Sequence, residues 1–247
     1  MALFITGGTR GIGLEIAKAF SAPGETVFVN YRSDEETASE AVAEIEALGG
    51  RAVALKGDCG TPAGCAALAD AVRASGVARI DQVVHCAVDA YATSCLEADP
   101  EAFSKAVATN GTALLFLVQS FLPLMDRGST VFFLSSRGGR IVVPKYAAIG
   151  VAKALAESLV RYLSAELAPK GIRINCVAPS LVDTAAVRTV FGDQAEDLVK
   201  HAGETNPTGR AIEARDYTSL IRWLASPEAE FIQGQVVYVN GGHNVMG

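Results

Sequence analysis

Short apolar runs alternate with helical patterns along the whole chain, and this alternation limits the folds open to it more than any other feature. Seven apolar runs bounded by turn residues predict strands, at residues 3–6, 26–31, 52–56, 82–86, 130–135, 173–177 and 235–240. Helical stretches are predicted between them, at residues 12–21, 34–48, 61–74, 100–125, 146–168 and 214–225. Such alternation is typical of βα units that build a parallel sheet.

The sequence contains no internal repeat, no low-complexity run and no linker rich in Pro, Gly or Ser. We therefore expect residues 1–247 to form a single α/β domain of the Rossmann type. This domain is doubly wound, with helices on both faces of a seven-stranded parallel sheet in the order 3-2-1-4-5-6-7. The stretch 181–210 is long for a connection, has a helical pattern near 195–201, and is predicted to form a movable lid over the substrate. Its apolar members predict an acyl or polycyclic pocket, and they are Leu181, Val182, Val187, Val190 and Phe191.

Composition narrows the possible partners. A formal net charge of −6 argues against a nucleic-acid surface, which needs a basic face to neutralise phosphates. The sequence has neither a signal-peptide pattern at its start nor 18 uninterrupted apolar residues. We expect a soluble, cytoplasmic protein that does not enter a membrane. The five cysteines are scattered without a CysXaaXaaCys pair or a matching histidine spacing, so they are interpreted as reduced thiols and no metal site is expected.

A glycine-rich loop follows the first predicted strand directly. It reads Gly7, Gly8, Thr9, Arg10, Gly11, Ile12, Gly13, and a helix comes next. Glycines at 7, 11 and 13 allow a tight turn, a close approach of the backbone to a pyrophosphate, and close packing of the helix on the strand. The free N–H groups at the helix start suit phosphate oxygens. The loop and its position after the first strand predict a dinucleotide site.

The end of the second strand indicates which dinucleotide is bound. NAD enzymes usually place an acidic residue there, but this chain has no carboxylate before Asp34. Arg32, Ser33 and Arg10 can instead surround a 2′-phosphate, because a guanidinium bonds phosphate oxygens and keeps its charge. NADPH is therefore preferred over NADH. The alternative is that Arg32 is only a solvated loop charge.

Tyr146 and Lys153 are the candidate reactive pair. A tyrosine near a lysine ammonium has its phenolate favoured and can pass a proton to a developing oxyanion. On a helix, a spacing of seven residues is almost two turns, so both side chains project toward one face, about 10 Å apart along the axis. The alternative is an ordinary helix that carries a Tyr and a Lys by chance.

Several motifs together resemble the short-chain dehydrogenase/reductases over essentially the whole chain. ThrGlyGlyThrArgGlyIleGly at 6–13 is similar to the cofactor loop of this family, and Ser136 lies seventeen residues before Lys153, the usual serine-to-lysine spacing. Further matches are Asp58, Asn110 in ThrAsnGlyThr, AsnCysValAlaProSer with Thr184, and the closing strand at 234–242. The resemblance implies that the cofactor is contacted by the loop, by Asp58, Cys59, Lys153, Pro179, Val182 and Thr184.

The chain departs from the family pattern at two places, and the first of them resembles one branch of the family. The usual catalytic tyrosine, four residues before the lysine, is Ile149 here, and Tyr146 gives the Tyr-x6-Lys spacing of the enoyl-acyl-carrier-protein reductases. The segments 146–167 and 205–210 resemble the NADPH-using type III members of that branch. The loop after the fourth strand reads His85, Cys86, Ala87, Val88 instead of the usual AsnAsnAlaGly, and the second tyrosine common in enoyl reductases is absent, with Val142 nearby.

The resemblance implies NADPH-dependent reduction of the carbon–carbon double bond of an α,β-unsaturated acyl thioester, in fatty-acid or polyketide biosynthesis. Tyr146 would donate a hydrogen bond to the thioester oxygen and Lys153 would bond the nicotinamide ribose. Asn110 would hold the helix geometry or a water chain to the lysine. Ser136 would polarise a carbonyl or only line the pocket.

Two other functions stay open at this point. The first is a ketoreductase with an atypical donor, either Tyr146 or His85, and the second is a cofactor-binding protein without catalysis. His85 is either a donor to substrate or a satisfied structural residue. Arg137, Arg140 and Lys145 form a basic cluster that suits an acidic acyl carrier protein, or a solvated loop. The resemblance also implies a homotetramer or a homodimer.

Overall fold

A computed structural model of the chain, which describes residues 1–243, contains one sheet of seven parallel strands. The strands are β1 (Ala2–Thr6), β2 (Thr26–Tyr31), β3 (Arg51–Lys56), β4 (Gln82–His85), β5 (Thr130–Leu134), β6 (Arg173–Pro179) and β7 (Val236–Val239). Their order in the sheet is β3-β2-β1-β4-β5-β6-β7. The predicted order is therefore confirmed, and each predicted strand differs from the observed one by no more than two residues at either end.

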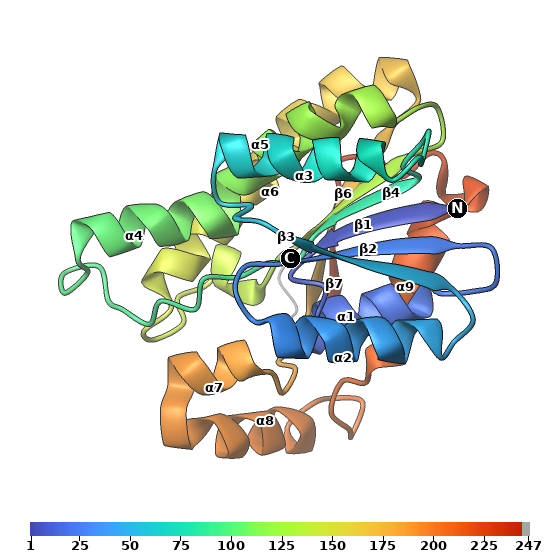
Figure 1. Cartoon of the computed structure of the whole chain (residues 1–247). Helices are drawn as coiled ribbons and strands as arrows, with labels where there is room; N and C mark the ends of the chain where they lie inside the picture. The colour runs from blue at the N-terminus through green and yellow to red at the C-terminus, as the bar shows by residue number, and fades with distance from the viewer. Residues whose placement is uncertain (244–247) are drawn as a thin grey trace.

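Helices cover both faces of the sheet (Figure 1). On one face lie α3 (Pro62–Ala74), α5 (Ala113–Phe121) and α6 (Ala147–Leu167), and on the other lie α1 (Gly11–Ala19), α2 (Glu35–Glu46) and α9 (Ala214–Ala225). Because successive strand residues point to opposite faces, β1 supplies both layers. Phe4 packs with the α3, α5 and α6 layer, whereas Leu3 and Ile5 pack with the α1, α2 and α9 layer.

The predicted helix at 100–125 is helical as far as Leu124 but is not a continuous α-helix. It consists of α4 (Pro100–Val107), a π-helical turn (Ala108–Thr112), α5 and a short 3₁₀ turn (Leu122–Leu124). By length and composition alone, the segment Pro100–Leu124 could cross a membrane. Half of its most apolar 18-residue stretch is buried inside the protein. Within it, α5 packs against α3 and β4 in the core, which accounts for its apolar residues. The π-helical turn lets α4 project beyond the sheet while α5 stays packed on it (Figure 1).

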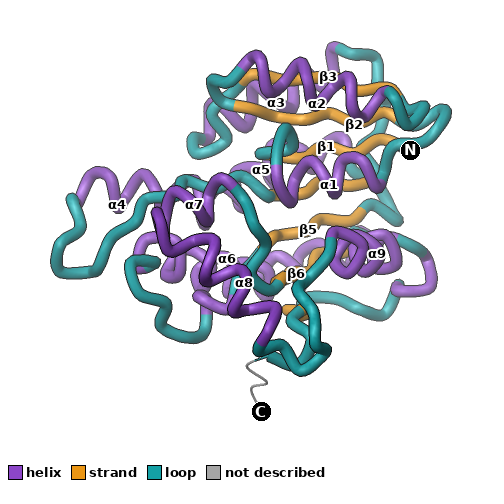
Figure 2. The backbone as a smooth tube through the Cα atoms, turned by 90° about the horizontal axis from the view of Figure 1, so that it is seen from below, coloured by secondary structure: helices purple, strands orange, loops and turns teal. Residues whose placement is uncertain are grey.

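The stretch predicted as a lid contains two helices, α7 (Ala185–Phe191) and α8 (Ala195–Glu204). The helical pattern expected near 195–201 is confirmed by α8, whereas α7 was not predicted. Figure 2 shows both helices lying together outside the carboxyl edge of the sheet.

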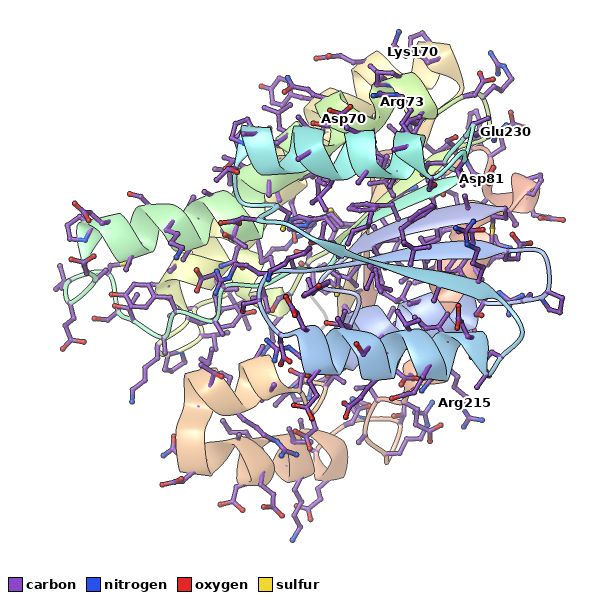
Figure 3. The ribbon with its side chains drawn as sticks, viewed as in Figure 1. Asp70, Arg73, Asp81, Lys170, Arg215 and Glu230 are labelled. Carbon is purple, nitrogen blue, oxygen red and sulfur yellow. The ribbon has the colours of Figure 1, made fainter. Side chains whose placement is uncertain are left out.

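Ion pairs on the surface face solvent, as Figure 3 shows for Asp70 and Arg73 on the outer face of α3.

Candidate active site

A cavity of about 490 Å³ lies at the carboxyl ends of the central strands. This is the position where open α/β sheets bind ligands, next to the point at which the strand order reverses between β1 and β4. All but one of the predicted catalytic residues line it, namely Ser136, Tyr146 and Lys153, together with the predicted cofactor contacts Gly7, Thr9, Arg10, Gly11, Ile12, Gly13, Arg32, Ser33, Asp58, Cys59, Pro179, Val182 and Thr184. The exception is Asn110, which is fully buried.

The glycine loop forms a cradle that larger residues would fill. Gly7 and Gly11 have positive φ angles of 62° and 54°, which side chains other than glycine disfavour. A Cβ atom at Gly13 would lie 2.1 Å from the carbonyl oxygen of Gly7, so only glycine lets α1 approach β1 this closely. Because α1 begins at Gly11, its first N–H groups have no partner within the helix and face a cavity suited to a phosphate.

Cationic side chains surround the other end of the cofactor cleft. Arg10 and Arg32 are exposed and line the cavity together with Ser33. The carboxylate of Asp34 is 4.0 Å from Arg10, and it also accepts a hydrogen bond from the backbone N–H of Thr37 as the N-cap of α2. That bond lowers the pKa of Asp34. The carboxylate of Asp34 is therefore engaged in capping α2.

Lys153 is buried under the site, and its ammonium group is held from below. Nζ donates a 2.7 Å hydrogen bond to the carbonyl oxygen of Leu134 at the end of β5, and it lies 4.6 Å from the centre of the Phe133 ring. Burial lowers the pKa of Lys153 to about 8. An ammonium has three donors, so those not used by Leu134 can reach a ligand in the cavity.

Tyr146 caps the start of α6 and lines the same cavity as Lys153. Its ring packs directly on Gly138, where an added Cβ would lie 2.6 Å from the ring carbons. Burial raises the pKa of the phenol, and the neighbouring Ser136 side chain opposes that rise. Ile149, at the usual tyrosine position of the family, is only 1% exposed and does not line the cavity. Tyr146 is therefore the phenol that α6 presents to the site.

The backbone around Tyr146 is fixed by the loop that follows β4. Thr93 pairs with Tyr146 in a parallel bridge, formed by the N–H of Thr93 with the carbonyl of Lys145 and by the N–H of Ala147 with the carbonyl of Thr93. Lys145 has a φ angle of 58°, the one positive value for a non-glycine residue within residues 1–243. Such conformations cost free energy and persist where surrounding contacts enforce them.

Asn110 lies in the π-helical turn and clasps the loop after β4. Its side-chain oxygen accepts from the N–H of Asp89 at 2.8 Å, and its amide nitrogen donates to the carbonyl of Asp89 at 2.9 Å. The side chain is thus engaged with backbone and makes no described bond to Lys153. Two roles were predicted for Asn110, namely to hold the helix geometry or to hold a water chain to Lys153. The observed bonds fit the first, because they tie the helix to the loop.

His85 is a structural residue rather than a free donor. Its Nε2 lies 3.0 Å from the carbonyl oxygen of Thr109, which can only accept, so the proton is on Nε2. Nδ1 then accepts from the hydroxyl of Thr6 at 2.7 Å. Burial lowers the pKa of His85 to about 3, which keeps it neutral. The alternative role of His85 as a substrate donor is excluded by these bonds, and Thr6 is a partner that sequence reasoning missed.

The substrate end of the cavity differs from expectation in several positions. Leu181, Val182 and Val187 line the cavity as predicted, together with Ile141, whereas Val190 and Phe191 do not. Val142 is 94% exposed and takes no part in the pocket. The basic cluster is not three free cations, because Nε of Arg140 donates to the buried carboxylate of Glu157 at 3.4 Å.

Within residues 1–243, no group of three or more His, Cys, Asp and Glu side chains could hold a metal ion. All five cysteines are free thiols. Burial raises the pKa of Cys59 and Cys86 to about 12, so neither cavity thiol is ionised near neutral pH. The side chains that line the cavity include the phenol of Tyr146, the ammonium of Lys153 and the hydroxyl of Ser136.

Sequence comparison now places this fold and site in a known class. The family model described as enoyl-(acyl carrier protein) reductase matches residues 7–244. The 1-cyclohexenylcarbonyl-CoA reductase of Streptomyces collinus is 32% identical over 98% of this chain and 86% of that protein. The NADH-dependent enoyl-[acyl-carrier-protein] reductase FabI of Synechocystis is 32% identical over 99% of this chain and 96% of that protein. The chain belongs to the short-chain dehydrogenase/reductase family, in the group of that model, and this family binds nicotinamide cofactors.

Solved structures agree on the fold and add a second activity. A dehydrogenase/reductase from Sinorhizobium meliloti superposes with a TM-score of 0.87 at 30% identity, covering 99% of this chain and 95% of that one. The angucycline C-6 ketoreductase LanV with bound NADP superposes with a TM-score of 0.87 at 27% identity, covering 98% of this chain and 94% of that one. Relatives with this backbone thus include proteins named as enoyl reductases and as ketoreductases.

Proposed function

We propose that this protein uses NADPH to reduce the carbon–carbon double bond of an α,β-unsaturated acyl thioester. The observation that carries the proposal is the place of the phenol. Tyr146, seven residues before Lys153, lines the cavity, while the position four residues before Lys153 holds a buried isoleucine outside it. The two relatives described above that share 32% identity are both named as reductases of unsaturated acyl thioesters, one of CoA type and one of carrier-protein type.

The chain's own residues fit a nicotinamide dinucleotide. The cradle of Gly7, Gly11 and Gly13 with the start of α1 would hold the pyrophosphate, and Arg10, Arg32 and Ser33 would hold a 2′-phosphate. Cys59, beside Asp58, lies in the same wall of the cavity. Solved relatives include complexes with NADP, whereas the FabI relative is named as an NADH enzyme. Bound NADPH would supply the hydride that reaches the β-carbon of the substrate.

Tyr146 and Lys153 would handle the charge that develops on the substrate. As the β-carbon gains a hydride, negative charge develops on the thioester oxygen, where the hydroxyl of Tyr146 donates a hydrogen bond. The ammonium of Lys153, fixed by the carbonyl of Leu134, favours that charge and offers its other donors to the ribose. A proton taken up at the α-carbon completes the saturated thioester. The raised pKa of Tyr146 keeps the phenol protonated and ready to donate.

The second candidate function is carbonyl reduction. The side chain of Ser136 interacts with the phenol of Tyr146, an arrangement that would also polarise a ketone. The LanV relative, named as a ketoreductase, has the same fold and was solved with bound NADP. The segment 181–210, with α7 along the cavity and α8 outside it, would act as the lid of a single catalytic domain in either case.

The test is the oxidation of NADPH, followed by absorbance, with a crotonyl thioester and an acetoacetyl thioester offered separately in CoA and carrier-protein forms. Consumption with the enoyl substrate is the expected result. Consumption with the keto substrate alone would transfer the assignment to carbonyl reduction. Tight NADPH binding without reduction of either substrate would contradict both activities for these acyl chains. Repeating the assay with NADH separates the cofactor assignment from the reaction.

A further inference from the structure

Glu157 is a buried carboxylate on α6 that the reaction above does not use. It is 4% exposed and lies one helical turn beyond Lys153. Its Oε1 accepts a 2.6 Å hydrogen bond from the hydroxyl of Ser135, and its Oε2 accepts from Nε of Arg140 at 3.4 Å. Burying a carboxylate costs free energy unless the group is paired and hydrogen-bonded. Glu157 meets both conditions through Ser135 and Arg140, which makes these two contacts important for its position.

The two partners of Glu157 are the two ends of one loop. Ser135 follows directly after β5, and Arg140 follows the short 3₁₀ turn at Arg137–Gly139. Between them, Gly139 lies close to the same carboxylate. A Cβ atom added at Gly139 would be only 3.1 Å from Oε1 of Glu157. We call residues 135–140 the serine loop. Its conformation depends on Glu157 at its start, its middle and its end.

The serine loop is the wall against which the phenol rests. Ser136 lies in it, and its side chain interacts with Tyr146. An added Cβ at Gly138 would lie 2.6 Å from the ring of Tyr146, and one at Gly150 would lie 2.7 Å from the carbonyl oxygen of Gly138. These glycines leave no room for a side chain between the loop, the ring and α6, so we expect a shift of the loop to move the ring.

Arg140 extends the same network to the last strand of the sheet. Its guanidinium carbon lies 5.1 Å from the centre of the Tyr238 ring on β7, and Tyr238 lines the cavity. The charge of Glu157 also favours the ammonium form of Lys153, in opposition to burial. Glu157 itself does not line the cavity, so it acts only through its neighbours.

We propose that Glu157 is a positioning residue that holds the serine loop, and through it Ser136 and the ring of Tyr146, in the geometry that the reaction needs. The inference rests on the proposed function, because it assigns Tyr146 as the group to be positioned. Misplacement of a reacting group by about 1 Å can cost about 100-fold in rate, so small loop movements are enough for a large effect.

The experiment compares Glu157→Ala with Glu157→Gln, which keeps the size and an acceptor for Ser135, and with Arg140→Met, which removes the other anchor at a partly exposed site. Glu166→Gln, an exposed carboxamide substitution on the same helix, is the matched control. With a crotonyl thioester, we expect Glu157→Ala to lower kcat by about 10- to 100-fold while the Kd of NADPH stays near wild type. Glu157→Gln should recover most of kcat, and Glu166→Gln should behave as wild type.

A second readout does not depend on turnover. The chain has 6 tyrosines, so ¹³C labelling of tyrosine gives a small set of ring signals, and Tyr146→Phe assigns the one of interest. We expect this signal to shift in Glu157→Ala and Arg140→Met and to stay in place in Glu166→Gln. A folded Glu157→Ala protein with wild-type kcat and an unmoved Tyr146 signal would overturn the inference. If Glu157→Ala does not fold, the same two results for Arg140→Met would overturn it.

The two proposals fail separately in this design. A wild-type protein that reduces no enoyl thioester contradicts the proposed function, while the Tyr146 signal still tests whether Glu157 fixes the ring. An active wild-type protein whose variants keep both kcat and the Tyr146 signal contradicts only the role of Glu157.

Discussion

The hydroxyl of Thr6 donates a 2.7 Å hydrogen bond to Nδ1 of His85, and the two residues end the adjacent strands β1 and β4. The same hydroxyl accepts from the backbone N–H groups of Cys86 and Ala87, both at 3.1 Å. The backbone of Ala87 then packs on Gly7, where an added Cβ would lie 2.8 Å from its Cα. Thr6, bonded to His85, therefore holds the start of the unusual loop after β4 against the glycine cradle, and Asn110 holds the same loop further along at Asp89.

Replacing His85 by Gln should make the protein less sensitive to mild acid. The pKa of His85 is about 3 in the folded state and near 6.5 when unfolded, so between these values the unfolded chain binds the extra proton. Stability is fully present above about pH 6.5 and falls with pH toward 3, by up to about 1.4 kcal/mol per pH unit from this group. Urea unfolding at pH 7, 6 and 5 measures the slope. An identical slope in His85→Gln and wild type would contradict the buried neutral imidazole.

Replacing Tyr146 by Phe should lower kcat by about 100- to 10,000-fold, the usual contribution of a positioned proton donor. The ring and its packing on Gly138 are kept, so the melting temperature and the Kd of NADPH should stay close to wild type. Steady-state kinetics together with cofactor fluorescence separates the two effects. Tyr162→Phe, a change at an exposed tyrosine on α6 that does not line the cavity, serves as the control. Normal turnover by Tyr146→Phe would show that another group donates.

Replacing Lys153 by Met should raise the Kd of NADPH by about tenfold or more, because one charged hydrogen bond contributes about 1.5–3 kcal/mol. In the wild type the ammonium form is lost as pH rises above about 8, so NADPH affinity should fall in that range. In Lys153→Met this part of the pH dependence should be absent. Fluorescence titrations between pH 7 and 9.5 test both statements, with the exposed Lys170→Met as control.

Replacing Arg32 by Ala should weaken NADPH binding by about 10- to 100-fold and leave NADH binding nearly unchanged, because only NADPH carries the 2′-phosphate. The exposed Arg51 at the opposite, amino end of the sheet provides the control Arg51→Ala. Equal losses for both cofactors would mean that Arg32 does not read the phosphate. Higher salt should reduce the preference for NADPH in the wild type, since screening weakens exposed ion pairs.

The fold follows from local signals, which is why sequence reasoning reached it. Each strand is a short apolar run and each helix a longer one with its own period, and the glycine loop is read from adjacent residues. The prediction of a continuous helix at 100–125 was wrong in one respect, since a π-helical turn interrupts it. A single such turn is too short to leave a recognisable period in the sequence. Asn110 in this turn bonds to the backbone of Asp89, a contact between distant residues that sequence periodicity does not show. The missed α7 is too short, at 7 residues, for a clear pattern.

The support of the site was much harder to predict than its lining. Tyr146, Lys153 and the glycine loop stand in recognisable spacings, and the structure places them around one cavity. The pairs that hold them join residues far apart in the chain, such as Thr6 with His85, which are separated by 79 positions. Glu157 reads as an ordinary polar helix residue until its burial is known. Sequence periodicity carries no information about such pairs, since they depend on how distant elements meet.

The backbone bridge between Thr93 and Tyr146 constrains how this enzyme can change its substrate range during evolution. One wall of the site, the loop from Asp89 to Thr93, is bonded through Thr93 to Lys145 and Ala147, the residues on either side of Tyr146. An insertion or deletion between Asp89 and Thr93 would disturb this pairing and displace the backbone of Tyr146 at the start of α6. Adaptation to a new acyl group is thus directed toward exchanges of side chains in this loop, and toward length changes on the opposite rim, around α7.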